Sequence, residues 1–393
     1  MRNSPFPNLK ISDKNRSINQ LMLLVCTGLI PGTITQFYFF GWGVLINLLL
    51  CSIFAVSAEA LILKIRKRPV VAILKDNSAL LTGLLLGLAI PPLLPWWMSF
   101  IGVYFAIIFA KHLYGGLGYN PFNPAMIGYV LLLISFPLAM TNWLPTQELL
   151  ILKPNLIQSV NLTFFGITTG ITNEFNTVSD IKTLADGFTM ATPLDLIRTS
   201  ISQGFMLSEI QSHSSENDSF NINSSSWVWV NVAYLFGGIY LLLLKIIRWH
   251  IPVSIMVSMI ITSAFLSMLD NQIYLSASDH LFYGASMLGV FFIATDPVSA
   301  STTQKGRLVY GALIGFTLIM IRTFGSYPDA FAFSVILLNI ASPTIDHYFR
   351  PKVYGMKSPV EVIPVKVLDD NLQDDSLQVL DFKNHDFKDR HNE

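Results

Sequence analysis

Long blocks of apolar residues, separated by short polar connections, run along most of the chain. A bilayer core about 30 Å thick needs roughly 20 apolar residues per helix, and ten stretches come close to that length. They are 20–40, 42–63, 79–95, 96–112, 123–142, 227–247, 251–269, 280–297, 307–322 and 328–348. The pattern predicts an all-α polytopic membrane protein with about ten transmembrane helices. Pro91 and Pro92 are expected to break the end of the third stretch.

The composition supports a membrane protein and excludes several other classes. The 393 residues are 52% hydrophobic and 13% charged, and the mean hydropathy is +0.52. Soluble domains carry about 25% charged residues, so a soluble enzyme and a disordered protein are both excluded. The formal net charge is +0 and no basic stripe is present, which argues against a nucleic-acid partner. Residues 1–18 are polar and no small-residue cleavage motif follows, so no cleavable signal peptide is expected.

Lysine and arginine residues orient the predicted helices. If the N-terminus is placed in the cytoplasm, the cytoplasmic segments contain 21 of the 25 basic residues. The segments on the other side keep only Lys153, Lys182, Arg198 and Arg322. Because cytoplasmic loops are enriched in Lys and Arg, ten spans predict that both termini are cytoplasmic and that the long loop 143–226 is periplasmic.

Two proline-marked motifs recur at nearly the same offset. Residues 89–92 (AIPP) match residues 294–297 (ATDP) at an offset of 205, and residues 120–125 match residues 327–332 more weakly at an offset of 207. The recurrence predicts two five-helix units, and an odd number of helices makes the second unit inverted in the membrane. The alternative explanation is that Gly and Pro are simply common in membrane helices.

The predicted organisation has five parts, including two membrane repeats. They are a cytoplasmic N-terminus (1–18), the first repeat (19–142), the periplasmic loop (143–226), the second repeat (227–349) and a cytoplasmic tail (350–393). The tail carries nine acidic residues from Glu361 onward and few large apolar residues. That composition is typical of a disordered segment.

A short motif in the loop has the features of a helix start. Thr192, Pro193 and Asp195 have the character of an N-cap, a first-turn residue and a third-position acid. A helix is therefore expected to begin here. A capped surface helix with no further role explains the local sequence equally well.

From about residue 19 to residue 350 the chain resembles the RnfD proteins of the Rnf ion-translocating electron transport complexes. A more distant resemblance is to the NqrB proteins of the sodium-pumping NADH:quinone reductases. The stretches that carry the resemblance are FFGWG (39–43), LKDNSALLTGLLL (74–86), IPPLLPWW (90–97), KHLYGGLGYNPFNPAMIGYVLLLISFP (111–137) and DGFTMATPLD (186–195). The block 111–137 is long and highly specific.

The resemblance implies a covalent flavin on Thr192. In this family the last threonine of a D-x-x-[ST]-x-A-T pattern carries FMN through a phosphoester bond, attached by a separate flavin transferase. The pattern falls on Asp186, Thr189, Ala191 and Thr192. The positive end of a helix would favour a phosphodiester there, whereas Asp195 would oppose it with a like charge.

The resemblance also implies a second, non-covalent flavin (riboflavin or FMN) in the membrane part and other subunits of an Rnf-type complex as partners. It places the chain among membrane lipids in a bacterial inner membrane. Asn123 and Asp296 are candidates for that second flavin site or for an ion site. The simpler explanation for Asn123 is that it forms a turn at the start of a helix. Glu59, Asp296, Asp329 and Asp346 all lie near predicted span ends, where interfacial solvation is the simpler explanation.

Several other sites are not expected. Gly115, Gly116 and Gly118 follow no strand and do not form a dinucleotide fingerprint, which argues against NADH binding. Cys26 and Cys51 lie inside apolar runs and are expected to pack in the core. The seven histidines show no i, i+4 pairing, so no metal site is predicted.

The sequence thus favours a flavin-carrying subunit of a membrane complex that couples electron transfer to ion transport. No catalytic residue is assigned, and the isolated chain is not expected to act as an enzyme by itself. The alternative is an inverted-repeat solute channel or secondary transporter without a redox role. Thr192 discriminates between them, because a transporter has no use for a flavin in an exposed loop. The quinone reductase family is disfavoured because residues 1–18 are shorter than the N-terminal arm of its members.

Overall fold

The computed structural model describes residues 16–143, 154–165, 192–210, 224–325, 327 and 330–350. Within these ranges the regular structure is helical throughout and contains no strand. The predicted tail, 350–393, lies outside the described residues apart from Arg350. The all-helical character expected from the sequence is therefore confirmed for the part of the chain that can be described.

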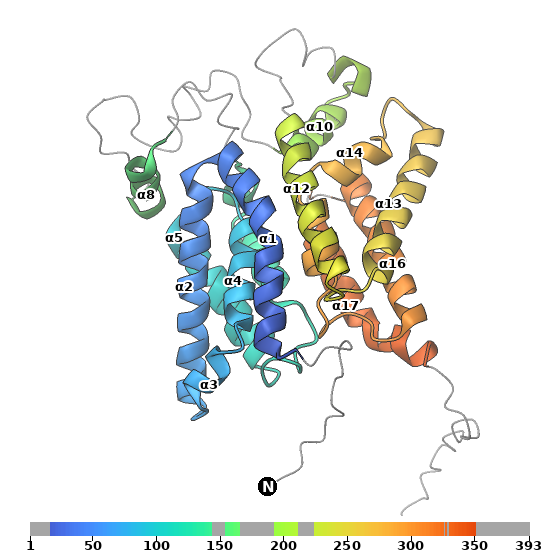
Figure 1. The fold of residues 1–393 in the computed structure, drawn as a ribbon. Coiled ribbons are helices and arrows are strands. Elements are labelled where there is room, and N and C mark those ends of the chain that lie inside the picture. The colour runs from blue at the N-terminus through green and yellow to red at the C-terminus, as the bar shows by residue number, and fades with distance from the viewer. Residues whose placement is uncertain are drawn as a thin grey trace, which may run out of the picture. The chain divides into compact units, whose positions relative to one another are not determined.

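Five helices are long and apolar enough to cross a membrane by length and composition (Figure 1). They are α1 (Ile18–Phe40), α2 (Trp42–Ile65), α12 (Ser224–Leu243), α13 (His250–Leu269) and α16 (Gln304–Phe324). Each coincides with one of the predicted stretches. These helices support a polytopic membrane protein.

The other predicted stretches correspond to shorter or interrupted helices. In chain order these are α4 (Ser78–Ala89), α5 (Trp96–Phe105) with the π-helix η1 (Ala106–His112), α6 (Pro124–Ser135), α7 (Pro137–Thr141), α14 (Ala277–Phe282), α15 (Ser286–Leu288) with the π-helix η3 (Gly289–Ile293), and α17 (Phe331–Tyr348). Three further helices lie in the connections: α3 (Val70–Leu74), α8 (Leu156–Phe165) and α10 (Pro193–Ser202).

The interruptions have identifiable causes. α4 ends at Ala89, because Pro91 and Pro92 supply no N–H to continue it, as the sequence predicts. Phe136 separates α6 from α7 because it precedes Pro137, and the residue before a proline is disfavoured in helical conformation. The stretch 280–297, expected to be one helix, is instead broken between α14 and α15.

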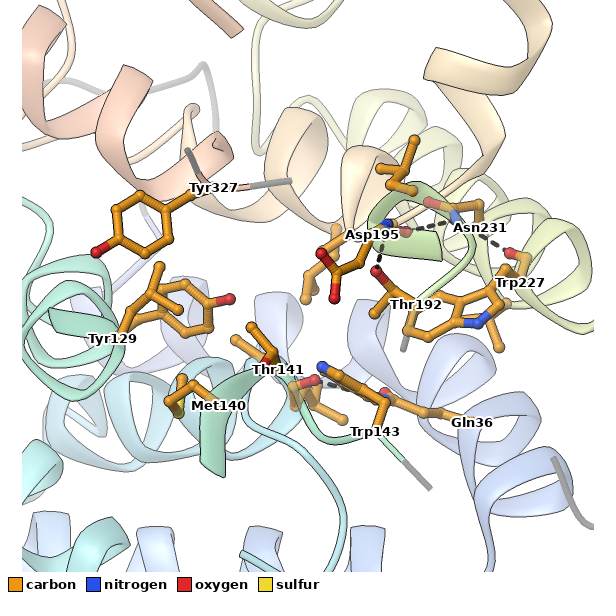
Figure 2. Close-up of a pocket in the computed structure, with 18 of the residues that line it drawn as sticks. Gln36, Tyr129, Met140, Thr141, Trp143, Thr192, Asp195, Trp227, Asn231 and Tyr327 are labelled. Atoms are coloured by element: carbon orange, nitrogen blue, oxygen red, sulfur yellow. Dashed lines mark hydrogen bonds between the residues drawn. The ribbon is translucent and has the colours of Figure 1, made fainter. Parts of the chain in front are cut away.

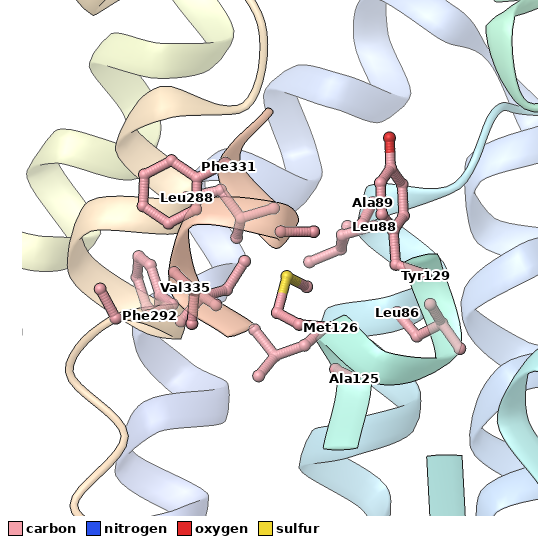
Figure 3. Packing of buried hydrophobic residues seen from close by; sticks show 14 of the residues in the cluster. Leu86, Leu88, Ala89, Ala125, Met126, Tyr129, Leu288, Phe292, Phe331 and Val335 are labelled. Atoms are coloured by element: carbon pink, nitrogen blue, oxygen red, sulfur yellow. The ribbon is translucent and has the colours of Figure 1, made fainter. Parts of the chain in front are cut away.

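The buried core lies where the two halves of the chain meet. α1 packs beside α12, and α6 packs beside α17. Figure 3 shows Met126 of α6 between Leu88 of α4 and Leu288 and Val335 of the second half, all at most 4% exposed. Inside the first half, Gly83 lets α4 approach α2 closely, since a Cβ there would lie 2.6 Å from the carbonyl oxygen of Cys51.

The helix neighbours within the two halves correspond. In the first half α2 contacts α4 and α5, and α6 contacts α4 and α5. In the second half α13 contacts η3 and α16, and α17 contacts η3 and α16. The same set of four neighbour relations therefore occurs twice.

Candidate functional site

Thr192 lies at the start of α10, as the sequence predicts. Its backbone is extended (φ −67°, ψ 156°), and its Oγ1 accepts a hydrogen bond of 3.3 Å from the N–H of Asp195. Pro193 occupies the first helical position, where its missing N–H costs nothing. The Thr192 side chain is half-buried. The other motif residues, Asp186, Thr189 and Ala191, lie outside the described residues.

An open cavity lies beside this helix start, and we call it the threonine cavity. Figure 2 shows the side chains of Thr192 and Asp195 facing the same space as Thr141 and Trp143. Aromatic side chains form much of its wall: Tyr129, Trp143, Trp227, Tyr234 and Tyr327. The Trp143 and Trp227 rings pack edge to face, with centroids 5.1 Å apart. The cavity thus offers the hydroxyl groups of Thr192 and Thr141 at an aromatic, largely apolar space.

Asp195 brings a carboxyl group into the same cavity. Partial burial raises its pKa above the ordinary value, and the nearby guanidinium of Arg198 only partly offsets that effect. The carboxylate lies in the first turn of α10, where the helix dipole favours a negative charge. A phosphate group on Thr192 would lie at the same helix end as the carboxylate of Asp195.

A second open cavity is lined by Asn120 and Asn123, and we call it the asparagine cavity. Asn123 is the N-cap of α6: its Oδ1 accepts from the N–H of Ala125 at 3.0 Å, and its Nδ2 donates to the carbonyl oxygen of Ile293 at 3.4 Å. Asp296 lines the same cavity and accepts hydrogen bonds from Val298 N–H and Ser299 Oγ. The structure thus brings together the two residues that the sequence singled out separately.

Asn120 was not predicted as a site residue. Its side chain is buried, its Nδ2 donates to the carbonyl oxygen of Phe122 at 2.9 Å, and its Oδ1 has no partner among the described residues. A buried acceptor without a partner is costly, and it is expected to bind a donor from a ligand or water.

Residues at equivalent offsets line the two cavities. Pairs separated by 205 to 207 residues, with one member in each cavity, include Gln36 and Leu241, Leu21 and Trp227, Ser78 and Gly284, Thr82 and Leu288, and Asn120 and Tyr327. The offsets agree with those of the two proline-marked motifs. Several residues of the two cavities are thus related by one common offset.

A family model described as the NQR2, RnfD, RnfE family matches residues 7–355. The chain belongs to this family. It is 51% identical over 340 residues to the protein designated D of the ion-translocating oxidoreductase complex of Escherichia fergusonii, covering 86% of this chain and 95% of that relative. The protein of the same name from Aliivibrio salmonicida is 52% identical over 342 residues, with 87% and 95% covered, and that from Cronobacter sakazakii is 49% identical over 340 residues, with 86% and 95% covered.

This family member also contains a buried charge cluster that the sequence reasoning missed. Glu59 is 0% exposed, and its Oε1 accepts from Lys111 Nζ at 2.5 Å and from His112 Nε2 at 3.1 Å. Lys111 is 2% exposed and also donates to Ser78 Oγ at 2.7 Å. The π-helix η1 contributes Lys111 and His112 in succession. Lys111 and Ser78 also line the asparagine cavity.

The expectation that Glu59 is solvated at a span end was therefore wrong. Lys111, counted among the 21 basic residues of the cytoplasmic segments, is buried. The available signal was an acid and a base that each lie near the end of a predicted apolar stretch, 52 residues apart. The sequence does not show that they meet. Asp346 behaves closer to expectation: it is half-exposed and accepts hydrogen bonds from Thr302 and Thr303 before α16. Asp329 lies outside the described residues.

The cysteines agree with the core assignment only in part. Cys51 is fully buried, whereas Cys26 is of intermediate exposure. Among the described residues no three His, Cys, Asp or Glu side chains come together as metal ligands.

Proposed function

We propose that the chain is the flavin-carrying membrane subunit of an ion-translocating oxidoreductase complex in a bacterial inner membrane. Its family and the names of its relatives support membership of such a complex. The observation that carries the flavin assignment is the position of Thr192 at the N-terminus of α10 and at the wall of an aromatic cavity. The other subunits of the complex and a flavin transferase are the partners of this proposal.

The residues around Thr192 fit a covalently held FMN. The Thr192 hydroxyl accepts one hydrogen bond but has no acceptor for its own proton among the described residues, so esterification breaks no described contact of that proton. The unpaired N–H groups at the start of α10 favour a phosphate there. The threonine cavity has aromatic walls that suit a planar ring. Bound FMN would supply one- and two-electron transfer, while the chain holds it in place and excludes water from one side.

The asparagine cavity is our proposed site for a second, non-covalent flavin or for an ion. Asn120 Oδ1 is a buried acceptor without a described partner, and Asn123 and Asp296 lie in the same cavity. Amide groups of this kind can recognise the polar edge of a flavin ring. The correspondence with the threonine cavity supports a site at the matching position.

The same correspondence supports an inverted repeat. Corresponding helices meet across the halves as α1 with α12 and α6 with α17, which is the arrangement expected around a pseudo-two-fold axis. α6 and α17 also begin at matched positions, Asn123 and Ala330. We propose ten spans with both termini in the cytoplasm and α10 on the periplasmic side.

The alternative is a solute channel or secondary transporter, since paired cavities at helix breaks are also typical of those proteins. The two functions differ at Thr192. If the chain is a transporter, no flavin is expected to remain bound to it after denaturation.

The decisive experiment is in-gel flavin fluorescence of protein produced together with a flavin transferase. The wild type is expected to fluoresce after denaturation, and Thr192→Ala is expected to lose the signal because no hydroxyl remains to be esterified. Thr199→Ala, on an exposed position of the same helix, is the control that should keep the signal, and Thr189→Ala should keep it at least in part. Thr192→Ser retains the hydroxyl and the cap, so it tests whether the transferase requires the methyl group. A colourless wild type favours the transporter, and a fluorescent Thr192→Ala variant rejects the site.

A further inference from the structure

A third open space lies between α10, α14, the segment that follows α13 and the C-terminal end of α16, and we call it the basic pocket. In Figure 1, α10, α14 and one end of α13 occupy the same end of the helical assembly. The described residues that line the pocket include Arg198, His280 and Arg322 and no carboxylate. This space is separate from both cavities proposed to hold flavins, although Leu194 lines both it and the threonine cavity.

Arg322 and His280 form the buried floor of the basic pocket. The Arg322 side chain is 5% exposed, and its guanidinium donates to the carbonyl oxygen of His280 at 2.7 Å and to Ser286 Oγ at 2.9 Å. Both of these acceptors are neutral. His280 is 4% exposed, and its Nδ1 has no hydrogen-bond partner among the described residues.

Arg198 reaches the pocket from α10. Its Nη1 is buried and has no hydrogen-bond partner within the part of the chain that the structure describes. Asp195, one turn earlier, faces the threonine cavity, and no ion pair within 4.0 Å joins the two side chains. A buried guanidinium donor without an acceptor is unfavourable, so the arrangement calls for an anionic acceptor in the pocket.

Apolar side chains form the rest of the pocket and continue onto the outer surface. Ile197, Ile201 and Leu275 line it, together with Ile273 and Phe324, which are 45% and 64% exposed. Phe324 ends α16, and Ile273 follows α13, two helices with the length and composition of membrane spans. The ends of such helices lie at the level of lipid headgroups.

We propose that the basic pocket binds the phosphate group of an anionic phospholipid, with Arg198 and His280 as ligands and an acyl chain along Ile273 and Phe324. A guanidinium presents paired N–H donors that match the geometry of phosphate oxygens. The apolar rim favours a lipid over a free phosphate ion, because a free ion would use only the basic floor.

The test uses the purified full-length chain in detergent and native mass spectrometry. Phosphatidylglycerol, phosphatidylcholine and inorganic phosphate are added separately, and the bound mass and the thermal midpoint are recorded. We expect one retained phosphatidylglycerol and a raised midpoint, with weaker effects of the other two. Equal binding of phosphatidylcholine rejects the charge-based assignment, and equal stabilisation by inorganic phosphate rejects the lipid.

Variants locate the binding site. Arg198→Gln is expected to weaken phosphatidylglycerol binding at least tenfold, whereas Arg248→Gln, an exposed arginine after α12, is expected to leave it unchanged. Unchanged binding in Arg198→Gln overturns the proposal. Ile273→Glu places a negative charge at the exposed rim and is expected to weaken binding even if Arg198→Gln does not fold. Retained binding in a folded Ile273→Glu variant overturns it as well.

Discussion

The phenol of Tyr234 donates a hydrogen bond of 2.9 Å to Oε1 of Gln36, and both side chains are almost completely buried. This contact joins α12 to α1 and therefore joins the two halves of the chain. Gln36 also donates from Nε2 to the carbonyl oxygen of Leu88 at 3.1 Å, in the last turn of α4. Both residues line the threonine cavity, so one short network links the interface of the halves, a helix end and the proposed flavin site.

Replacement of Tyr234 by Phe is expected to destabilise the protein by about 1–3 kcal/mol, because it leaves the buried Oε1 of Gln36 without a donor. Tyr240→Phe is the matched control on the same helix, and it should change stability by less than about 0.5 kcal/mol because that side chain is partly exposed. Unfolding in mixed micelles measures both. Adding Gln36→Leu to Tyr234→Phe should cost less than the sum of the two single changes. Equal stability of the two tyrosine variants would show that the contact contributes nothing.

Glu59→Gln is expected to cost about 3–5 kcal/mol, because it leaves the ammonium of Lys111 buried without its counter-charge. Lys111→Met should be similarly harmful, since it strands the carboxylate of Glu59. The double variant should recover most of the loss, because it removes both charges. Lys64→Met, on an exposed position of α2, is the control. The double variant is the informative one: if it is no more stable than the singles, the cluster is not held together by charge pairing.

The sequence predicts those features that local chemistry decides. Thr192 and Asp195 mark the start of α10 because an N-cap needs only neighbouring residues, and Pro91 ends α4 because it has no N–H. The break between α14 and α15 was not predictable, because its cause lies about 50 residues away in the chain. Asn231 donates from Nδ2 to the carbonyl oxygens of Phe282 and Gly284, both at 2.8 Å, and its Oδ1 accepts from Met287 N–H at 3.0 Å.

The candidate sites also divide into residues that their own local sequence identifies and residues that depend on a distant partner. Asn123 could be identified from its own motif, since it is both a helix cap and a cavity residue. Its proximity to Asp296 could not, because the two lie in different halves. Glu59 and Lys111 were misplaced for the same reason: a charged residue near a predicted span end looks solvated until its partner in space is known.

Asp195 gives a prediction for pH. Its pKa is raised in the folded protein by partial burial, so the folded state holds its proton more tightly than the unfolded state does. The contribution of Asp195 to the free energy of unfolding is therefore most favourable below the ordinary pKa of its carboxyl group. It falls as pH rises through the interval up to the folded pKa and stays lower above it. Asp195→Asn should raise the thermal midpoint relative to wild type at about pH 7 and leave it nearly unchanged well below about pH 4. A difference that is the same at both pH values would exclude the carboxylate as its cause.

The proposed orientation makes opposite predictions for the two ends of α16. Gln203, just after α10, lies at the end of the molecule where the basic pocket joins α10 to the end of α16, whereas Lys305 lies in the first turn of that helix. If α16 crosses the membrane with the polarity set by the basic residues, Gln203 is periplasmic and Lys305 is cytoplasmic. In a chain with Cys26 and Cys51 replaced by Ala, Gln203→Cys should react with an impermeant thiol reagent in intact cells. Lys305→Cys should react only after the cells are opened. Both positions are exposed, so access through the membrane is the only barrier. Labelling of Lys305→Cys alone in intact cells would invert the proposed topology, and labelling of both would show that α16 does not separate the two sides.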